Sequence, residues 1–206
     1  EEYEPQVFRS LAKLFSKTAL EVCEGQQWDV DFESRNDVSE AEYLKMIEYK
    51  TAVLVGAAMK MGGIVAQTSE ENCNLIYDFG LNLGIAFQLQ DDYLDAFGDP
   101  ATFGKQVGGD IIENKKTYLY LKALEQGNDF EKQNLLQWFS VQPEDYSDKV
   151  VAVKNIFRHT GADTATQNAI EAYTYRAFAT LEKLNITEEN KTLLRNFGES
   201  LMQRNV

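Results

Sequence analysis

Three aspartates and a glutamine follow one another at helical spacing within residues 83–95. At about 100° per residue they share one helix face, within an arc of roughly 100°; they are Gln88, Asp91, Asp92 and Asp95. Like charges at this spacing destabilise an exposed helix by ~0.2–0.5 kcal/mol per pair, and by more where they are partly buried. A divalent cation that also binds a polyphosphate removes this repulsion, and Mg²⁺ commonly takes one or two carboxylates together with phosphate oxygens and water. The pattern favours magnesium ligands over a solvated acidic face, because the neighbouring residues 85–87 are apolar.

Lysines are gathered where an acidic chain would need them to bind an anion. The formal net charge of −13 argues against a nucleic-acid-binding protein, which needs a basic surface. An acidic protein binds phosphates only where lysines or bound cations reverse the local field. The glycine-rich segment 104–109 contains Lys105, and Lys115 and Lys116 follow it. It is not a P-loop, because Gln106 stands where Ser or Thr is required. We predict phosphate contacts here; the alternative for Lys115 and Lys116 is ordinary surface charge at the start of a helix.

A further lysine, Lys50, precedes Thr51 at the start of an apolar stretch. A lysine in such a place usually extends along its own stem to reach water. Anion binding is the other interpretation, and the two residues taken by themselves leave both open.

Apolar spacings of three and four residues predict an all-α fold, and strand signals are scarce. Helices are predicted at 6–24, 41–66, 70–97, 115–126, 129–139, 145–160, 163–184 and 187–204. Breaks are predicted at Gly25–Glu40 and at 98–112, among others. Thr187, followed by two glutamates, is typical of a helix start.

The bulk properties indicate one globular domain over residues 1–206. No stretch approaches the roughly 20 uninterrupted apolar residues that span a bilayer. The sequence begins without the basic and apolar segments of a signal peptide. Two cysteines, Cys23 and Cys73, make a disulfide framework implausible and are expected to be small core residues. A cytoplasmic protein is expected.

The aspartate segment carries a resemblance to a known family. Phe87-Gln88, then Asp91-Asp92-Tyr93-Leu94-Asp95 and the following 97–100 (Phe-Gly-Asp-Pro), closely resemble the second aspartate-rich motif of the trans-type polyprenyl diphosphate synthases. Residues 25–29 (Gly-Gln-Gln-Trp-Asp) resemble the family's Gly-Gln-x-x-Asp, and Lys50-Thr51 its Lys-Thr pair. Lys105 and Lys115 match the family's Gly-Lys and Asn-Lys, whose lysines bind the allylic diphosphate.

The resemblance implies a set of site residues. It assigns catalysis to Lys50, Thr51, Gln88 and Lys105, substrate binding also to Gln26, Phe87 and Lys115, and Mg²⁺ to Asp91, Asp92, Asp95 and Asp29. The implied fold is the helical bundle of the isoprenoid synthases. The implied reaction condenses isopentenyl diphosphate with an allylic diphosphate to give a longer trans-polyprenyl diphosphate, in an enzyme that usually forms homodimers.

One part of the family pattern is missing from these residues. The family carries a first aspartate-rich motif before the Gly-Gln-x-x-Asp, and nothing before Gly25 matches it. We therefore expect the chain to correspond to the latter two-thirds of a complete enzyme, truncated at the N-terminus and poorly active by itself. The alternatives are a class I terpene cyclase, a non-catalytic subunit that modulates a complete synthase, and a plain helical interaction module. The retained aspartates and lysines favour the synthase.

Overall fold

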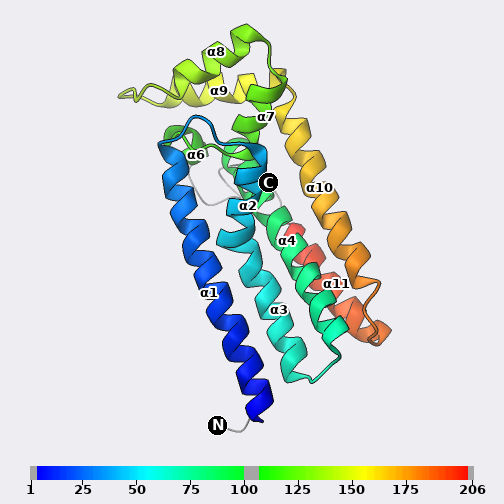
Figure 1. Cartoon of the computed structure of the whole chain (residues 1–206). Helices are drawn as coiled ribbons and strands as arrows, with labels where there is room; N and C mark the ends of the chain where they lie inside the picture. Colours follow the sequence, from blue (N-terminus) through cyan, green and yellow to red (C-terminus); the bar gives the residue numbers. More distant parts are fainter. Residues whose placement is uncertain (1–3, 100–106, 204–206) are drawn as a thin grey trace. The chain divides into compact units, whose positions relative to one another are not determined.

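The structure is a computed structural model that describes residues 4–99 and 107–203. These residues form helices joined by turns, without a strand among them (Figure 1), which confirms the all-α prediction. The elements are α1 (Pro5–Glu33), α2 (Glu40–Ile47), the π-helical turn η1 (Glu48–Ala52), α3 (Val53–Val65), α4 (Glu70–Phe97), α6 (Gly109–Ile112), α7 (Tyr118–Gln126), α8 (Asp129–Trp138), α9 (Ser147–His159), α10 (Ala162–Leu181) and α11 (Glu188–Met202).

The chain divides into two compact units. The first, unit 1, comprises the described residues up to Asp29, Leu44–Gln88 and Glu171–Gln203. The second, unit 2, comprises Val30–Tyr43 and the described part of 89–170. The boundaries fall inside α1, α2, α4 and α10.

Unit 1 packs its helices through glycines that let two backbones touch. A Cβ atom added to Gly25 in α1 would lie 2.3 Å from the backbone nitrogen of Lys50 in η1. One added to Gly84 in α4 would lie 2.6 Å from the Cα atom of Ala52. The predicted break at Gly25 is therefore wrong: α1 continues to Glu33, and the glycine serves close packing at the cost of helix propensity.

The apolar core of unit 1 joins α4 to the second half of α10 and to the residues before α11. Its buried members are Phe79, Leu83, Ala177, Leu181 and Leu184. The last helix begins as predicted, because Oγ1 of Thr187 accepts a hydrogen bond from the backbone N–H of Asn190 at 3.3 Å.

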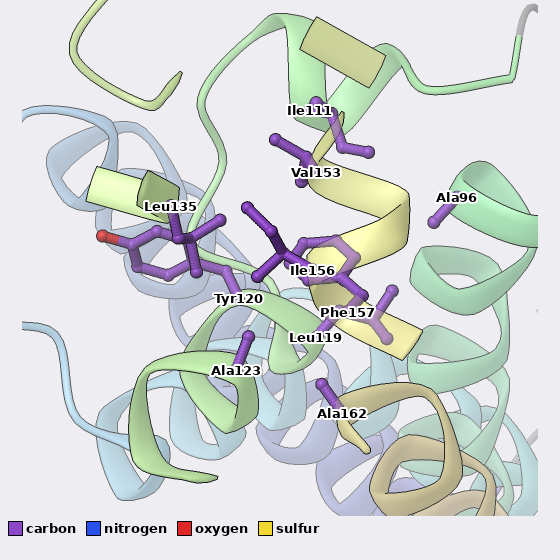
Figure 2. Close-up of a cluster of buried hydrophobic side chains, with 10 residues drawn as sticks. All are labelled: Ala96, Ile111, Leu119, Tyr120, Ala123, Leu135, Val153, Ile156, Phe157 and Ala162. Carbon is purple, nitrogen blue, oxygen red and sulfur yellow. The ribbon is translucent and has the colours of Figure 1, made fainter. Parts of the chain in front are cut away.

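Unit 2 is built around a second core, which Figure 2 shows from close by. Its buried side chains come from the end of α4, from α6 to α9, and from the start of α10: Ala96, Ile111, Leu119, Tyr120, Ala123, Leu135, Val153, Ile156, Phe157 and Ala162. A capping box between Asn128 and Glu131 begins α8, and each residue's side chain accepts from the backbone N–H of the other. Through Ile111, this core packs α6 against α9.

Three local features differ from the predictions. The continuous helix predicted at 41–66 contains the π-helical turn η1. The predicted break at 98–112 ends in a short helix, α6, which begins after Gly108 at φ +91°. Of the two cysteines predicted to be core residues, Cys73 is buried, whereas Cys23 is exposed on α1.

Within the described residues, no helix combines the length and the apolar character needed to cross a membrane.

Candidate active site

The first group of predicted site residues gathers around η1 in unit 1. A π-helical turn carries one extra residue per turn, and such turns occur frequently at functional sites. Here it contains Lys50 and Thr51, and the backbone N–H of Val53 closes it on the carbonyl of Glu48. The bare backbone of Gly25 lies directly against the turn. The turn therefore sets where both side chains leave the helix.

Each of the two side chains has a polar partner on another helix. Nζ of Lys50 donates a hydrogen bond to Oδ2 of Asp29 on α1 at 2.5 Å, and both side chains are largely buried. Oγ1 of Thr51 donates to Oε1 of Gln88 on α4 at 2.9 Å. The structure thus brings together four of the predicted residues. The carboxylate of Asp29 orients the ammonium group of Lys50, and a lysine that binds an anion needs such an orientation.

Two further predicted residues lie in unit 1 without taking part in these contacts. Phe87 on α4 is partly buried, next to Gln88 in the chain. Gln26 is exposed on α1, one turn before Asp29.

Three aspartates near the end of α4, Asp91, Asp92 and Asp95, lie in unit 2 and have different surroundings. Asp91 and Asp95 are partly exposed, whereas Asp92 is buried, with 7% of its surface exposed. The buried hydroxyl of Tyr43 donates a hydrogen bond to Oδ2 of Asp92. Burial and the charge of Asp92 raise the pKa of Tyr43 well above its usual value, so the tyrosine remains a donor. Asp92 therefore uses one carboxylate oxygen to tie α4 to α2.

Asp95 faces a second carboxylate, that of Asp110 at the start of α6. The backbone N–H of Asp110 donates to Oδ2 of Asp95 at 3.0 Å. Burial, and then repulsion by Asp110, raise the pKa of Asp95 to about 6. Burial also raises the pKa of Asp110. Two partly buried carboxylates that resist ionisation next to each other favour a bound cation.

Lys115 closes this group from the turn after α6. Its Nζ lies 3.3 Å from Oδ1 of Asp110 and 3.1 Å from Oε2 of Glu113. Partial burial by itself would lower the pKa of Lys115, but the two carboxylates outweigh it and raise that pKa. Unit 2 therefore holds a half-buried set of alternating charges: Asp95, Asp110 and Lys115.

The structure adds two residues that the sequence did not single out. Asp110 follows two glycines and precedes Lys115 by five residues, so its place in the loop was a usable signal. Tyr43 lies 49 residues before Asp92, and no local pattern connects the two. Lys105, the remaining predicted residue, lies outside the described residues.

The family model for polyprenyl synthetase matches residues 4–157. The chain belongs to the polyprenyl synthetase family.

Solved and curated members of this family agree with that assignment. The chain is 37% identical over 191 residues to the geranylfarnesyl diphosphate synthase of Natronomonas pharaonis, a match that covers 91% of this chain and 52% of the relative. It is similar to a crystal structure of geranylgeranyl pyrophosphate synthase, with a TM-score of 0.93 and 53% identity over 99% of this chain and 63% of that one. A third similar protein is geranylgeranyl pyrophosphate synthase from Corynebacterium glutamicum, crystallised with isoprenyl diphosphate and magnesium (TM-score 0.88, 26% identity, 98% of this chain and 57% of that one).

These polyprenyl synthetases share the all-α isoprenoid synthase fold, so the predicted fold type is confirmed. The chain spans from about half to somewhat over three-fifths of their lengths.

Proposed function

We propose that the protein is a prenyltransferase that condenses isopentenyl diphosphate with an allylic diphosphate to give a longer trans-polyprenyl diphosphate. The observation that carries the proposal is the half-buried set of Asp95, Asp110 and Lys115, in a chain that belongs to the polyprenyl synthetase family. The carboxylates of this set can bind a cation, and the cation and the ammonium group of Lys115 would together neutralise the negative charge of a bound diphosphate.

The carboxylates fit Mg²⁺ as a cation that is also coordinated by substrate. Within residues 4–99 and 107–203, no three acidic side chains converge closely enough to hold a metal by themselves. Mg²⁺ typically takes one or two carboxylates and completes its shell with phosphate oxygens and water. Asp91 and Asp95 are the ligands that we propose, because both side chains are partly exposed, whereas Asp92 is buried against Tyr43 and Asp29 forms an ion pair with Lys50. When bound, the cation would stabilise negative charge on the departing diphosphate.

The side chains of the protein have distinct tasks in this scheme. We propose that Lys50, Lys105 and Lys115 neutralise diphosphate oxygens, which makes breakage of the allylic carbon–oxygen bond easier. Asp29 and Thr51 orient Lys50 and Gln88 through the hydrogen bonds described above. The bond that forms joins the allylic carbon to the terminal alkene carbon of isopentenyl diphosphate, and loss of a proton completes the product.

Two coarser expectations accompany the proposal. The free cysteines fit a reducing compartment, and we propose that the protein works in the cytoplasm. Membership of the family supports a homodimer, which light scattering of the purified protein would detect.

The deciding experiment follows product formation by the protein expressed from its complete reading frame. Labelled isopentenyl diphosphate is supplied with geranyl or farnesyl diphosphate, with Mg²⁺ or with EDTA, and products are identified by mass spectrometry. We expect elongation with Mg²⁺ only, and a loss of about 100-fold or more in Asp91→Asn. Asp78→Asn is the matched control, because Asp78 is an exposed aspartate on the same helix. Elongation in EDTA, or full activity in Asp91→Asn, would contradict the proposal.

A further inference from the structure

The turn that follows α6 contains two adjacent lysines in opposite surroundings. Lys115 is partly exposed beside Asp110, whereas Lys116 is buried, with 7% of its surface exposed. The ammonium of Lys116 donates hydrogen bonds to the main-chain carbonyl oxygens of Glu33 and Asn114, at 3.0 Å each. A charge removed from water is expensive even when carbonyl dipoles receive it.

A second buried lysine reaches the same asparagine from α9. Lys149 is fully buried, and its Nζ donates to Oδ1 of Asn114 at 2.6 Å and to the carbonyl oxygen of Val141 at 3.3 Å. The rings of Phe139 and Tyr146 lie 5.7 and 5.8 Å from the ammonium. The packing of Ile111 on α6 near Val153 on α9, visible in Figure 2, keeps the two helices together.

The two buried ammonium groups disfavour each other. Burial lowers the pKa of Lys116 and that of Lys149, and the charge of Lys116 lowers the pKa of Lys149 further. Among the ion pairs of the described residues, neither lysine has a carboxylate partner. Both ammonium groups instead donate hydrogen bonds to Asn114. The two buried charges therefore hold this residue in place.

Asn114 is the residue at which the chain reverses after α6. Its φ of +60° lies in the left-handed region, which asparagine adopts more readily than most residues with a side chain but less readily than glycine. The N–H of Asn114 donates to the carbonyl of Ile111 at 3.3 Å, and the N–H of Lys115 donates to that of Asp110 at 2.9 Å. Together they form a Schellman motif, which turns the chain back on the helix. The reversal is what returns the Lys115 ammonium to Asp110.

We propose that Lys149 is a positioning residue that holds Asn114 in its left-handed conformation and thereby fixes the direction of Lys115. Lys116 completes the arrangement through the carbonyl oxygen of the same asparagine. The inference rests on the proposed function, in which Lys115 binds the diphosphate of the allylic substrate.

The first test measures substrate kinetics in Lys149→Met, which removes the ammonium and keeps an unbranched apolar side chain. We expect the KM for the allylic diphosphate to rise about tenfold, because a charge-assisted contact is misplaced. The KM for isopentenyl diphosphate should stay within about twofold, since Lys115 is proposed to serve the allylic substrate. Lys132→Met on α8 is the matched control and should leave both values unchanged.

Rescue separates positioning from a general loss of stability. Glycine adopts the left-handed conformation without help, so Asn114→Gly in the Lys149→Met background should return the allylic KM to within about threefold of the unaltered protein. Asn114→Ala, which disfavours that conformation, should reproduce the defect of Lys149→Met by itself. This variant leaves α9 intact and serves if Lys149→Met fails to fold. An allylic KM that is unchanged in Asn114→Ala would overturn the proposal.

Amide hydrogen exchange gives a readout that does not depend on the reaction. The N–H of Lys115 is bonded to Asp110, so peptides that cover 113–117 should exchange faster in Lys149→Met and recover in the double variant. If the unaltered protein elongates no primer, the proposed function is wrong. The exchange measurement would still show whether Lys149 holds Asn114 in place. Faster exchange with unchanged KM values, or normal exchange in an active protein, would overturn the positioning role.

Discussion

At the residue scale, the most informative group is the carboxyl of Asp95. Burial and the nearby Asp110 raise its pKa to about 6. The ionised form, which binds a cation, therefore lowers the free energy of unfolding near neutral pH. A bound cation would remove this cost, and the protein without metal bears it in full. The charge state of Asp95 therefore links acidity, metal binding and stability.

The pH dependence of folding should show this cost. The pKa of Asp95 is about 6 in the folded chain, whereas an aspartate in an unfolded chain has a pKa of 3.8. Between these two pH values the folded state therefore binds more protons than the unfolded state. The contribution of Asp95 to the free energy of unfolding is then largest below about pH 4 and is lost as the pH rises through 6. Urea unfolding in EDTA at pH 5.0 and 7.5 measures the change, and Asp95→Asn should make it smaller. An equal change in both proteins would contradict the assignment.

Tyr43 offers a second prediction at this scale. Tyr43→Phe removes the hydroxyl that donates to Asp92 and alters little else in volume. The free energy of unfolding should fall by about 1.5–3 kcal/mol, the usual loss for a buried hydrogen bond to a charged group. Tyr175→Phe removes a hydroxyl from a tyrosine that is 75% exposed and should cost almost nothing. Chemical denaturation of both variants checks the contrast, and similar losses would show that the Tyr43 bond is unimportant.

At the element scale, glycines decide how closely α1 approaches η1. Gly25→Ala would place a methyl group 2.3 Å from a backbone nitrogen that cannot move without moving Lys50. We expect a loss of about 1–3 kcal/mol in the free energy of unfolding, together with lower activity. Gly62→Ala in α3 meets nothing within 4 Å and should instead gain up to about 1 kcal/mol from helix propensity. Thermal and urea unfolding measure both, and a stabilised Gly25→Ala would contradict this packing.

The elements also show what a single sequence can and cannot predict. The bounds of α4 follow from its apolar spacing and agree with the structure at both ends. The start of α11 follows from Thr187. In contrast, the prediction that Gly25 ends a helix was wrong. This glycine allows close contact with a segment 25 residues further along the chain, and no local pattern reveals that contact. The turn η1 has no local signal, since its extra residue is accommodated by packing against neighbouring helices.

The candidate site divides in the same way. Asp91, Asp92 and Asp95 share a helix face that their spacing alone predicts, and the acidic net charge indicated that an anion-binding site would need lysines. The different environments of Asp92 and Asp95 were not predictable, because they depend on Tyr43 and Asp110 from other elements. The pairing of Lys50 with Asp29 was likewise fixed only by the fold.

At the scale of the whole molecule, a net charge of −13 opposes any anionic ligand that arrives without a cation. Mg²⁺ and inorganic diphosphate should therefore stabilise the protein jointly. At saturating concentrations we expect a rise in Tm of about 5 °C or more with both present, and little change with either alone. Differential scanning calorimetry measures it, with Asp91→Asn as the variant that should lose the joint effect. An equal rise with diphosphate in EDTA would contradict shared coordination.

The unequal placement of the two cysteines has a practical consequence. Cys23 is exposed on α1, whereas Cys73 is 6% exposed and burial raises the pKa of its thiol. A maleimide dye should therefore label the folded protein at one position without any mutagenesis. The second thiol would react only when α4 separates transiently from α3, because its sulfur lies beside Gly63. The rate of the slow labelling phase would then measure how often unit 1 opens locally, without any substitution in the sequence.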